Sequence, residues 1–178
     1  MATKTVLCKI EGLPPGLLMH SYPMEPVKNP EKMSKEEQAK LAEYRSPEGE
    51  LFVPALNVQR MLVAAAAFSK GKGRASLSKI VAAVVSVNPS RLILTPQKYV
   101  VDSRRVVVPA TKGSVIRHRP CFEEWSLEFE IAYDAFELTE GQVRQVVDDA
   151  GSKVGLLDFR PAKTGPFGRF MVVKWEAK

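Results

Sequence analysis

The sequence predicts an α+β fold from a few regular stretches. Between Trp125 and Tyr133 apolar residues alternate with polar ones, which is the two-residue period of a half-buried strand. The stretches 58–68 and 143–150 carry apolar residues at the spacing of a helix face. Segments 4–10 and 170–176 predict the first and the last strand. The resulting order, β-α-β-β-α-β, is the ferredoxin-like or RNA-recognition arrangement.

Two insertions interrupt this order within a single domain that spans 1–178. Residues 21–50 hold four prolines around a charged stretch, so they predict a surface arm that is mobile unless a partner orders it. Ser34 with Glu37 three residues on is a capping-box pattern and predicts a short helix inside the arm. Residues 99–119 predict a long basic hairpin, because two apolar runs flank a turn that contains Gly113.

Between the insertions the chain continues the core. The helix over 58–68 is expected to stop at the loop 69–74, where two glycines lie among three cations. Residues 78–87 are apolar, and their β-branched side chains favour a strand near the end of the stretch. Residues 91–95 predict a further short strand.

The last forty residues combine a helix, a glycine-rich loop and the closing strand. Thr139 and Gln142 match a capping box, and Gly151 is placed to end the helix. The following segment, 155–169, holds three glycines, three cations and two aromatic residues. Glycine lets a backbone approach a ligand, cations meet phosphate and aromatic faces stack on bases. We interpret this glycine loop as facing a nucleic-acid strand.

Positive charge is concentrated in one third of the chain. The net charge is +6, but residues 69–119 hold 11 basic residues and a single acidic one, Asp102. The rest of the chain holds 15 basic and 19 acidic residues. Such segregation indicates a polyanionic partner. The alternative is a solvated basic surface without a partner, and the loop at 69–74 is equally well explained as a plain helix-ending loop.

Few residues suggest catalysis, metal binding or a cofactor, and we expect none of the three. Cys8 and Cys121 match no metal-ligand spacing and are expected to be small buried hydrophobes. The loop 69–74 lacks the Gly-Lys-Ser/Thr of a nucleotide-binding loop. The first residues lack a secretory signal, and the longest apolar run, 61–68, is too short to span a bilayer. A cytoplasmic protein without a membrane partner is therefore expected.

Two motifs resemble a known group of proteins. The segment from Gly151 through Gly165 to Val173 is similar to the glycine-rich loop and closing strand of the RAMP superfamily, whose members are associated with CRISPR systems. Residues 52–57 and the alanine-rich helix after them resemble the entry to that superfamily's first helix, and the basic hairpin resembles the thumb of its backbone subunits. The chain also resembles a family of phage or prophage proteins that share segments 17–20 and 165–170.

This resemblance implies an RNA-recognition-like fold and repeated subunits along one strand, in a bacterial host cell. With the charge pattern it predicts a non-catalytic protein, of phage or mobile-element type, that binds single-stranded DNA or RNA. The expected binding residues are Lys70, Lys72, Arg74, Arg104, Arg105, Lys112, Arg117, His118, Arg119, Arg160, Lys163, Phe167 and Arg169. The alternatives are an assembly subunit of a phage or CRISPR-like complex and, because RAMP relatives that process RNA use a histidine, a metal-independent ribonuclease acting through His118.

Overall fold

The computed structural model describes residues 2–70 and 76–178, and it belongs to the mixed α+β class. Its largest sheet has four strands in the order β4-β8-β1-β9, and every neighbouring pair is antiparallel. The bounds are Thr3–Gly12 for β1, Val85–Asn88 for β4, Ser126–Asp134 for β8 and Phe170–Ala177 for β9. The first and last strands of the chain are therefore neighbours, and β1 lies in the middle of the sheet.

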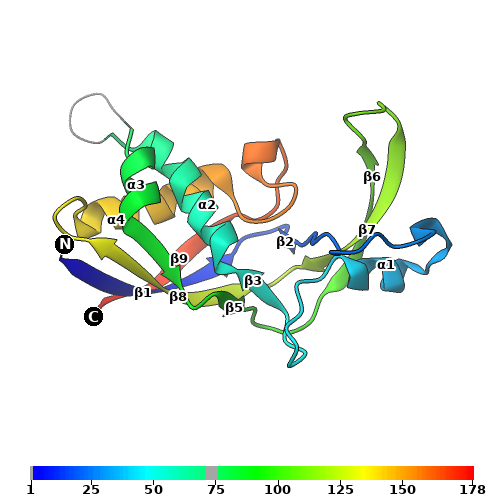
Figure 1. The fold of residues 1–178 in the computed structure, drawn as a ribbon, viewed down its shortest axis with the longest axis horizontal. Helices are drawn as coiled ribbons and strands as arrows, with labels where there is room; N and C mark the ends of the chain where they lie inside the picture. Colours follow the sequence, from blue (N-terminus) through cyan, green and yellow to red (C-terminus); the bar gives the residue numbers. More distant parts are fainter. Residues whose placement is uncertain (1, 71–75) are drawn as a thin grey trace.

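Three helices cover one face of this sheet, as Figure 1 shows. They are α2 (Ala55–Ala65), α3 (Ser78–Val84) and α4 (Glu140–Asp149). The core between the layers contains Val6, Cys8 and Ile10 from β1, each fully buried, and the predicted apolar face of β8. The alternation over 125–133 and the helical spacing in α2 and α4 are thus confirmed. Both cysteines are buried, and burial raises the pKa of Cys8 to about 12 and that of Cys121 to about 11.

The apolar stretch 78–87 divides between a helix and a strand. Its first part forms α3, and only its last residues join the sheet as β4. Val85 and Val87 lie opposite Tyr133 and Ile131 of β8, and all four side chains are buried. The β-branched end of the stretch is therefore a strand, as predicted, because β8 supplies its pairing partner.

Gly151 does not end the last helix, contrary to the prediction. After α4 the chain continues as one wider helical turn, Ala150–Val154, and stops at Gly155, whose φ is 75°. A Cβ on Gly151 would lie 2.3 Å from the carbonyl oxygen of Phe170. Glycine at 151 therefore allows β9 to pass close to the helix, and Gly155 supplies the left-handed conformation that terminates it. The predicted cap at the other end is confirmed, since Gln142 N–H donates to Thr139 Oγ1.

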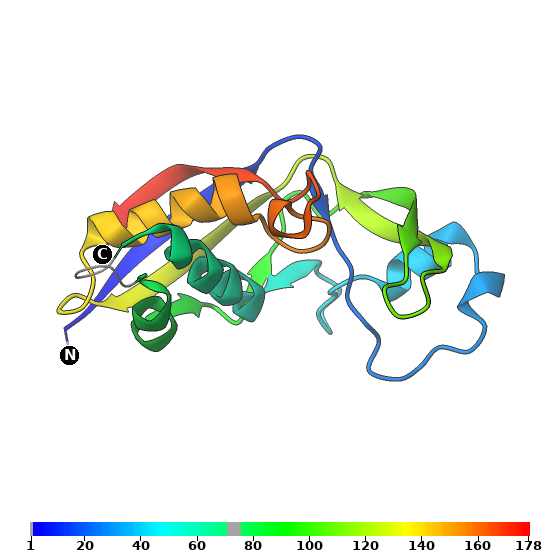
Figure 2. The ribbon, with the colours of Figure 1, turned by 90° about the horizontal axis from the view of Figure 1, so that it is seen from above.

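Two smaller sheets lie beside the core. In one, β2 (Leu17–Leu18) pairs with β7 (Ser114–Phe122), which also pairs with β6 (Val100–Val107); in the other, β3 (Phe52–Pro54) pairs with β5 (Arg91–Ile93). The β6–β7 hairpin occupies the predicted segment and stands away from the helix layer in Figure 1. Figure 2 places the hairpin at the end of the molecule opposite to the two chain termini.

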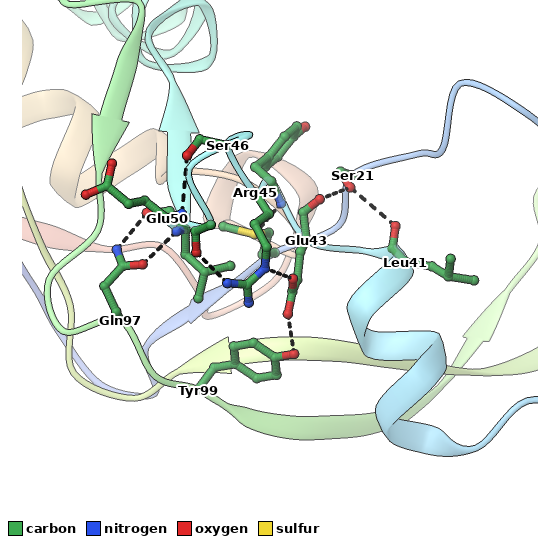
Figure 3. A network of polar contacts seen from close by, with 12 residues as sticks. Ser21, Leu41, Glu43, Arg45, Ser46, Glu50, Gln97 and Tyr99 are labelled. Atoms are coloured by element: carbon green, nitrogen blue, oxygen red, sulfur yellow. Dashed lines mark hydrogen bonds and ion pairs between the residues drawn. The ribbon is translucent and has the colours of Figure 1, made fainter.

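The arm at 21–50 is attached to the hairpin and does not stand free. Its helix, α1 (Lys35–Leu41), packs on β6 and β7 and carries the predicted capping box at Ser34. Ala39 and Ala42 are buried. A polar network ties the base of the arm to the start of β6, as Figure 3 shows: Glu43 accepts hydrogen bonds from Arg45 Nε at 2.6 Å and from Tyr99 Oη at 2.5 Å.

The hydrogen bonds of this network also shift the pKa values of Glu43 and Tyr99. Burial raises the pKa of the Glu43 carboxyl, but the hydrogen bonds from Arg45 and Tyr99 outweigh burial and hold it below its usual range. Burial and the same carboxylate raise the pKa of Tyr99 to about 12.

In the described part of the chain no helix is both long and apolar enough to cross a membrane.

Candidate nucleic-acid interface

The strand register sorts the hairpin cations onto two faces. Asp102 lies opposite Arg119, and Arg104 lies opposite Arg117, so these four side chains share one face. The neighbouring pairs have the opposite orientation, because successive side chains of a strand alternate. The face with Arg104, Arg117 and Arg119 is called the inner face below. The other, called the outer face, holds Ser103, Arg105, Val107, Ile116 and His118.

The inner face contacts the glycine loop. The guanidinium of Arg104 lies over the ring of Phe167 at 4.8 Å, and Arg119 Nη1 donates to Asp158 Oδ2 at 2.6 Å. Below these contacts Phe167 packs with Leu18 and Cys121 in a small buried cluster. Two basic segments that are far apart in the sequence therefore form one surface, as the nucleic-acid interpretation requires.

Asp158 is the centre of this junction. Besides the bond from Arg119, its Oδ2 lies 3.6 Å from His20 Nδ1, and its Oδ1 accepts from the N–H of Phe159. Burial raises the pKa of the Asp158 carboxyl, but the bonds from His20 and Arg119 and the charge of Arg119 outweigh burial and hold it far below its usual range. The carboxylate therefore stays ionised and fixes Arg119, and with it the hairpin, against the loop.

The glycines of the loop meet the protein's own backbone and not a ligand, contrary to the expected role. A Cβ on Gly165 would lie 1.9 Å from the carbonyl oxygen of Phe159, and one on Gly168 would lie 2.0 Å from that of Leu156. Leu157 and Phe159, on either side of Asp158, have φ angles of 61° and 45°. Bulky residues are rarely left-handed, so the close packing of the loop holds a strained backbone that aims Asp158 at the hairpin.

Two predicted binding residues are not available to a ligand. Phe167 is 1% exposed and its ring is covered by Arg104 and by the cluster with Leu18 and Cys121, so it cannot stack on a base. Arg119 is 4% exposed and is paired with Asp158, with Asp102 at 3.9 Å on its other side. Both residues hold the hairpin on the loop, so the prediction that they contact nucleic acid is wrong.

Arg104 and Arg117 remain on the surface of the inner face. Arg104 is bound through Nε by both oxygens of Asp102, at 2.9 Å each, and its side chain is 43% exposed. Arg117 has no carboxylate partner among the described residues; its Nη1 lies 3.3 Å from His20 Nε2. Two guanidinium groups thus occupy directly opposite positions on neighbouring strands, and one carboxylate, that of Asp102, binds one of them.

The remaining hairpin cations lie on the outer face and at the turn. Arg105 contacts Ser114 Oγ at 3.4 Å, and His118 Nδ1 shares a 2.7 Å hydrogen bond with Ser103. Lys112 lies in the turn with a φ of 59° and is exposed. These three residues do not contribute to the inner face, so the hairpin does not offer all its charge to a single groove.

The glycine loop adds three cations. Arg160 Nη1 donates to the carbonyl oxygen of Leu157 at 2.6 Å, and its other N–H groups form no hydrogen bond with a described residue. Lys163 and Arg169 are exposed, and in residues 2–70 and 76–178 neither forms an ion pair.

Lys70, from the first glycine loop, is not part of this surface. Lys70 lies beside α4 with Asp149 and Lys153, at the end of α2 that Figure 1 shows away from the hairpin. Lys72 and Arg74 lie outside the described residues. Among the described residues, the surface beside the hairpin is therefore formed by the second glycine loop, 155–169.

Two clefts border the junction and contain residues that the sequence did not single out. One, of about 320 Å³, lies between α2 and the glycine loop and is lined by Asn57, Arg60, Ala64 and Arg160. The other, of about 570 Å³, lies between the arm and the hairpin. His20 lines both, and its ring stacks on that of Tyr22 with centroids 4.4 Å apart. The three-residue spacing of Asn57 and Arg60 places both on one face of the helix. The sequence gives no indication that this face meets a loop about a hundred residues later in the chain.

The open face of the large sheet has a different character. Its charged side chains neutralise one another: Lys174 pairs with Glu128 and Glu176, and Lys178 pairs with Glu130. These pairs compensate the positive charge that a phosphate backbone would need on this face. No protein-family model and no curated protein matches the sequence.

Proposed function

We propose that this protein binds single-stranded nucleic acid without cleaving it, and that the phosphate backbone lies along the inner face of the hairpin and the glycine loop. The observation that carries the proposal is the direct opposition of Arg104 and Arg117 on one face of an exposed two-stranded ribbon. Like charges at opposite positions of neighbouring strands destabilise the pair. Asp102 compensates Arg104 alone, so a phosphate beside Arg117 compensates the remaining charge and accepts hydrogen bonds from both guanidinium groups.

The surroundings support a strand and not a single ion. Arg160, Lys163 and Arg169 extend the positive charge from the hairpin along the glycine loop, where no carboxylate of the described chain pairs with them. Tyr22, 74% exposed and stacked on His20 at the edge of the hairpin, offers the aromatic face that Phe167 does not. A backbone track of cations beside an exposed aromatic ring is typical of single-strand binding without base readout.

The fold is consistent with this function. A β-α-β-β-α-β chain whose first and last strands are neighbours, with its helices on one face, is the ferredoxin-like arrangement. We place the protein in that arrangement and propose, from the resemblance to RAMP backbone subunits, that repeated copies coat a strand in the cytoplasm of a bacterial host, in a phage or mobile-element setting. The charge-paired open sheet face argues against the usual mode of RNA-recognition domains, which stack bases on that face.

Fluorescence anisotropy with labelled single-stranded DNA and RNA tests the proposal. Binding through phosphate contacts releases counterions, so the affinity is expected to fall steeply and linearly on a log–log plot as salt rises. Affinity that does not change between low and moderate salt would rule the proposal out.

A second candidate, an assembly subunit, is favoured by one observation. Val107 and Ile116 on the outer face of the hairpin are 64% and 59% exposed, and clustered apolar side chains on a projecting ribbon can mark a protein contact. Light scattering with and without oligonucleotide separates the two functions. Assembly at the same concentration with and without oligonucleotide supports the assembly subunit, and assembly only in its presence supports strand coating.

A further inference from the structure

We infer that the cleft between α2 and the glycine loop binds a terminal phosphate group of a nucleotide. The inference rests on the proposed function, since it assigns a separate site for the end of the strand that the hairpin holds. The site is called the α2–loop cleft below and is formed by Asn57, Arg60, Ala64, His20 and Arg160 with the backbone of residues 154–158.

The cleft has walls suited to a small polar ligand. Asn57, Arg60 and Ala64 recur on one face of α2, and the small side chain of Ala64 leaves room between the helix and the loop. The volume of about 320 Å³ is within the size range of small-ligand sites. The strained backbone at Leu157 and Phe159 holds the opposite wall in place, as a preformed site requires.

The charge in the cleft suits a dianion. Arg60 and Arg160 come from two different elements and both line it, and in the described part of the chain neither has a carboxylate partner. Asp158, the acidic residue of the lining, is already paired with Arg119. A phosphomonoester carries close to two negative charges at neutral pH, whereas an internal phosphodiester carries one. Two guanidinium groups therefore match a terminal phosphate better than the middle of a strand.

The polar groups of the cleft also fit a nucleoside. Asn57 forms no side-chain hydrogen bond with any described residue, so its amide is free to donate to and accept from a base edge. His20 lines both this cleft and the arm–hairpin cleft, and it contacts Arg117 of the inner face. A strand on the inner face therefore reaches the α2–loop cleft past His20 without crossing the core.

The test compares otherwise identical single-stranded oligonucleotides that carry a 5′-phosphate, a 3′-phosphate or no terminal phosphate. We expect the wild-type protein to bind one of the phosphorylated strands about tenfold more tightly than the unphosphorylated strand, because charge-assisted bonds to two arginines are lost without the phosphate. The variant Arg60→Ala is expected to lose this preference and to keep salt-dependent binding, because Arg60 lines the cleft and is not part of the strand surface. Lys79→Ala, which removes one exposed charge on α3, is the control and keeps the preference.

Competition with a free nucleoside monophosphate distinguishes the two sources of the terminal phosphate, which are a free nucleotide and the end of a strand. Loss of the end preference at millimolar nucleotide means that the cleft takes the free nucleotide as well, and an unchanged preference means that it takes the phosphate only as part of a strand. Either result supports the site. Equal affinity of the wild type for all three strands overturns the inference, and if that binding remains salt-dependent the proposed strand function is unaffected. A preference that survives in Arg60→Ala also overturns it.

Discussion

The open face of the large sheet and the inner face of the hairpin both carry charged side chains, but they use them differently. On the sheet each of Lys174 and Lys178 has a glutamate partner on β8, across the intervening strand β1. On the hairpin Arg104 and Arg117 oppose each other, and one of them has no carboxylate partner in the described chain. The comparison teaches that the number of cations on a surface does not identify a polyanion site, whereas cations left without internal partners do.

The largest effect is expected for Phe167→Ala. This variant distinguishes a structural role of the ring from stacking on a base. Phe167→Ala is expected to lower the free energy of unfolding by about 3 kcal/mol, because it leaves a cavity in the cluster with Leu18 and Cys121. Phe136→Ala, at a site 75% exposed, is the control and should change stability by less than about 0.5 kcal/mol. Urea unfolding measures both. Unchanged stability of Phe167→Ala with reduced strand affinity would restore the stacking role.

An intermediate effect is expected at Asp158, which joins the two parts of the cationic surface. Asp158→Asn is expected to lower the free energy of unfolding at neutral pH by about 2 kcal/mol, because it weakens the pairing of the buried Arg119; this figure is already reduced for the partial exposure of Asp158. Since the folded-state pKa of Asp158 lies below its unfolded value, its contribution is present above about pH 4 and is lost as the pH falls toward the folded pKa.

Urea unfolding between pH 7 and pH 3 measures this dependence. The wild type is expected to lose stability on acidification faster than Asp158→Asn, so the two curves converge at low pH. Parallel curves would show that Asp158 does not fix the hairpin in the way the contacts indicate.

The smallest effect is expected at Thr139, which lies away from the hairpin. It tests whether reduced stability alone weakens strand binding. Thr139→Ala removes the N-cap of α4 and is expected to cost about 1 kcal/mol, while Thr139→Ser keeps the cap and most of the stability. Strand affinity should not change in either variant, because Thr139 lies beside α4 and away from the hairpin. A parallel fall in affinity would mean that reduced stability alone explains weaker binding.

Local signals in the sequence were sufficient for most of the fold. The alternation over 125–133 and the capping pairs at Ser34 and Thr139 depend on neighbours in the chain, and each is present in the structure. The role of Gly151 was not local: it depends on the passage of Phe170, which no pattern near 151 reveals.

The candidate site was less predictable for the same reason. Arg119 and Phe167 have the composition of contact residues, but the fold places Arg119 against a carboxylate 39 positions later and Phe167 under the hairpin. Charge counting cannot show which cations already have partners. Arg60 was overlooked because its position in an amphipathic helix gives no indication that a loop from the other end of the chain forms a cleft with it.

The most direct test of the central claim removes two charges from each of the compared faces. We expect Arg104→Gln/Arg117→Gln to weaken single-strand binding about tenfold and to reduce the log–log salt slope by about 1.4, the value for two lost phosphate contacts. Lys174→Gln/Lys178→Gln, with the same change in net charge, should leave the slope of the wild type unchanged. Equal losses from the two faces, measured by anisotropy over the same salt series, would contradict the account.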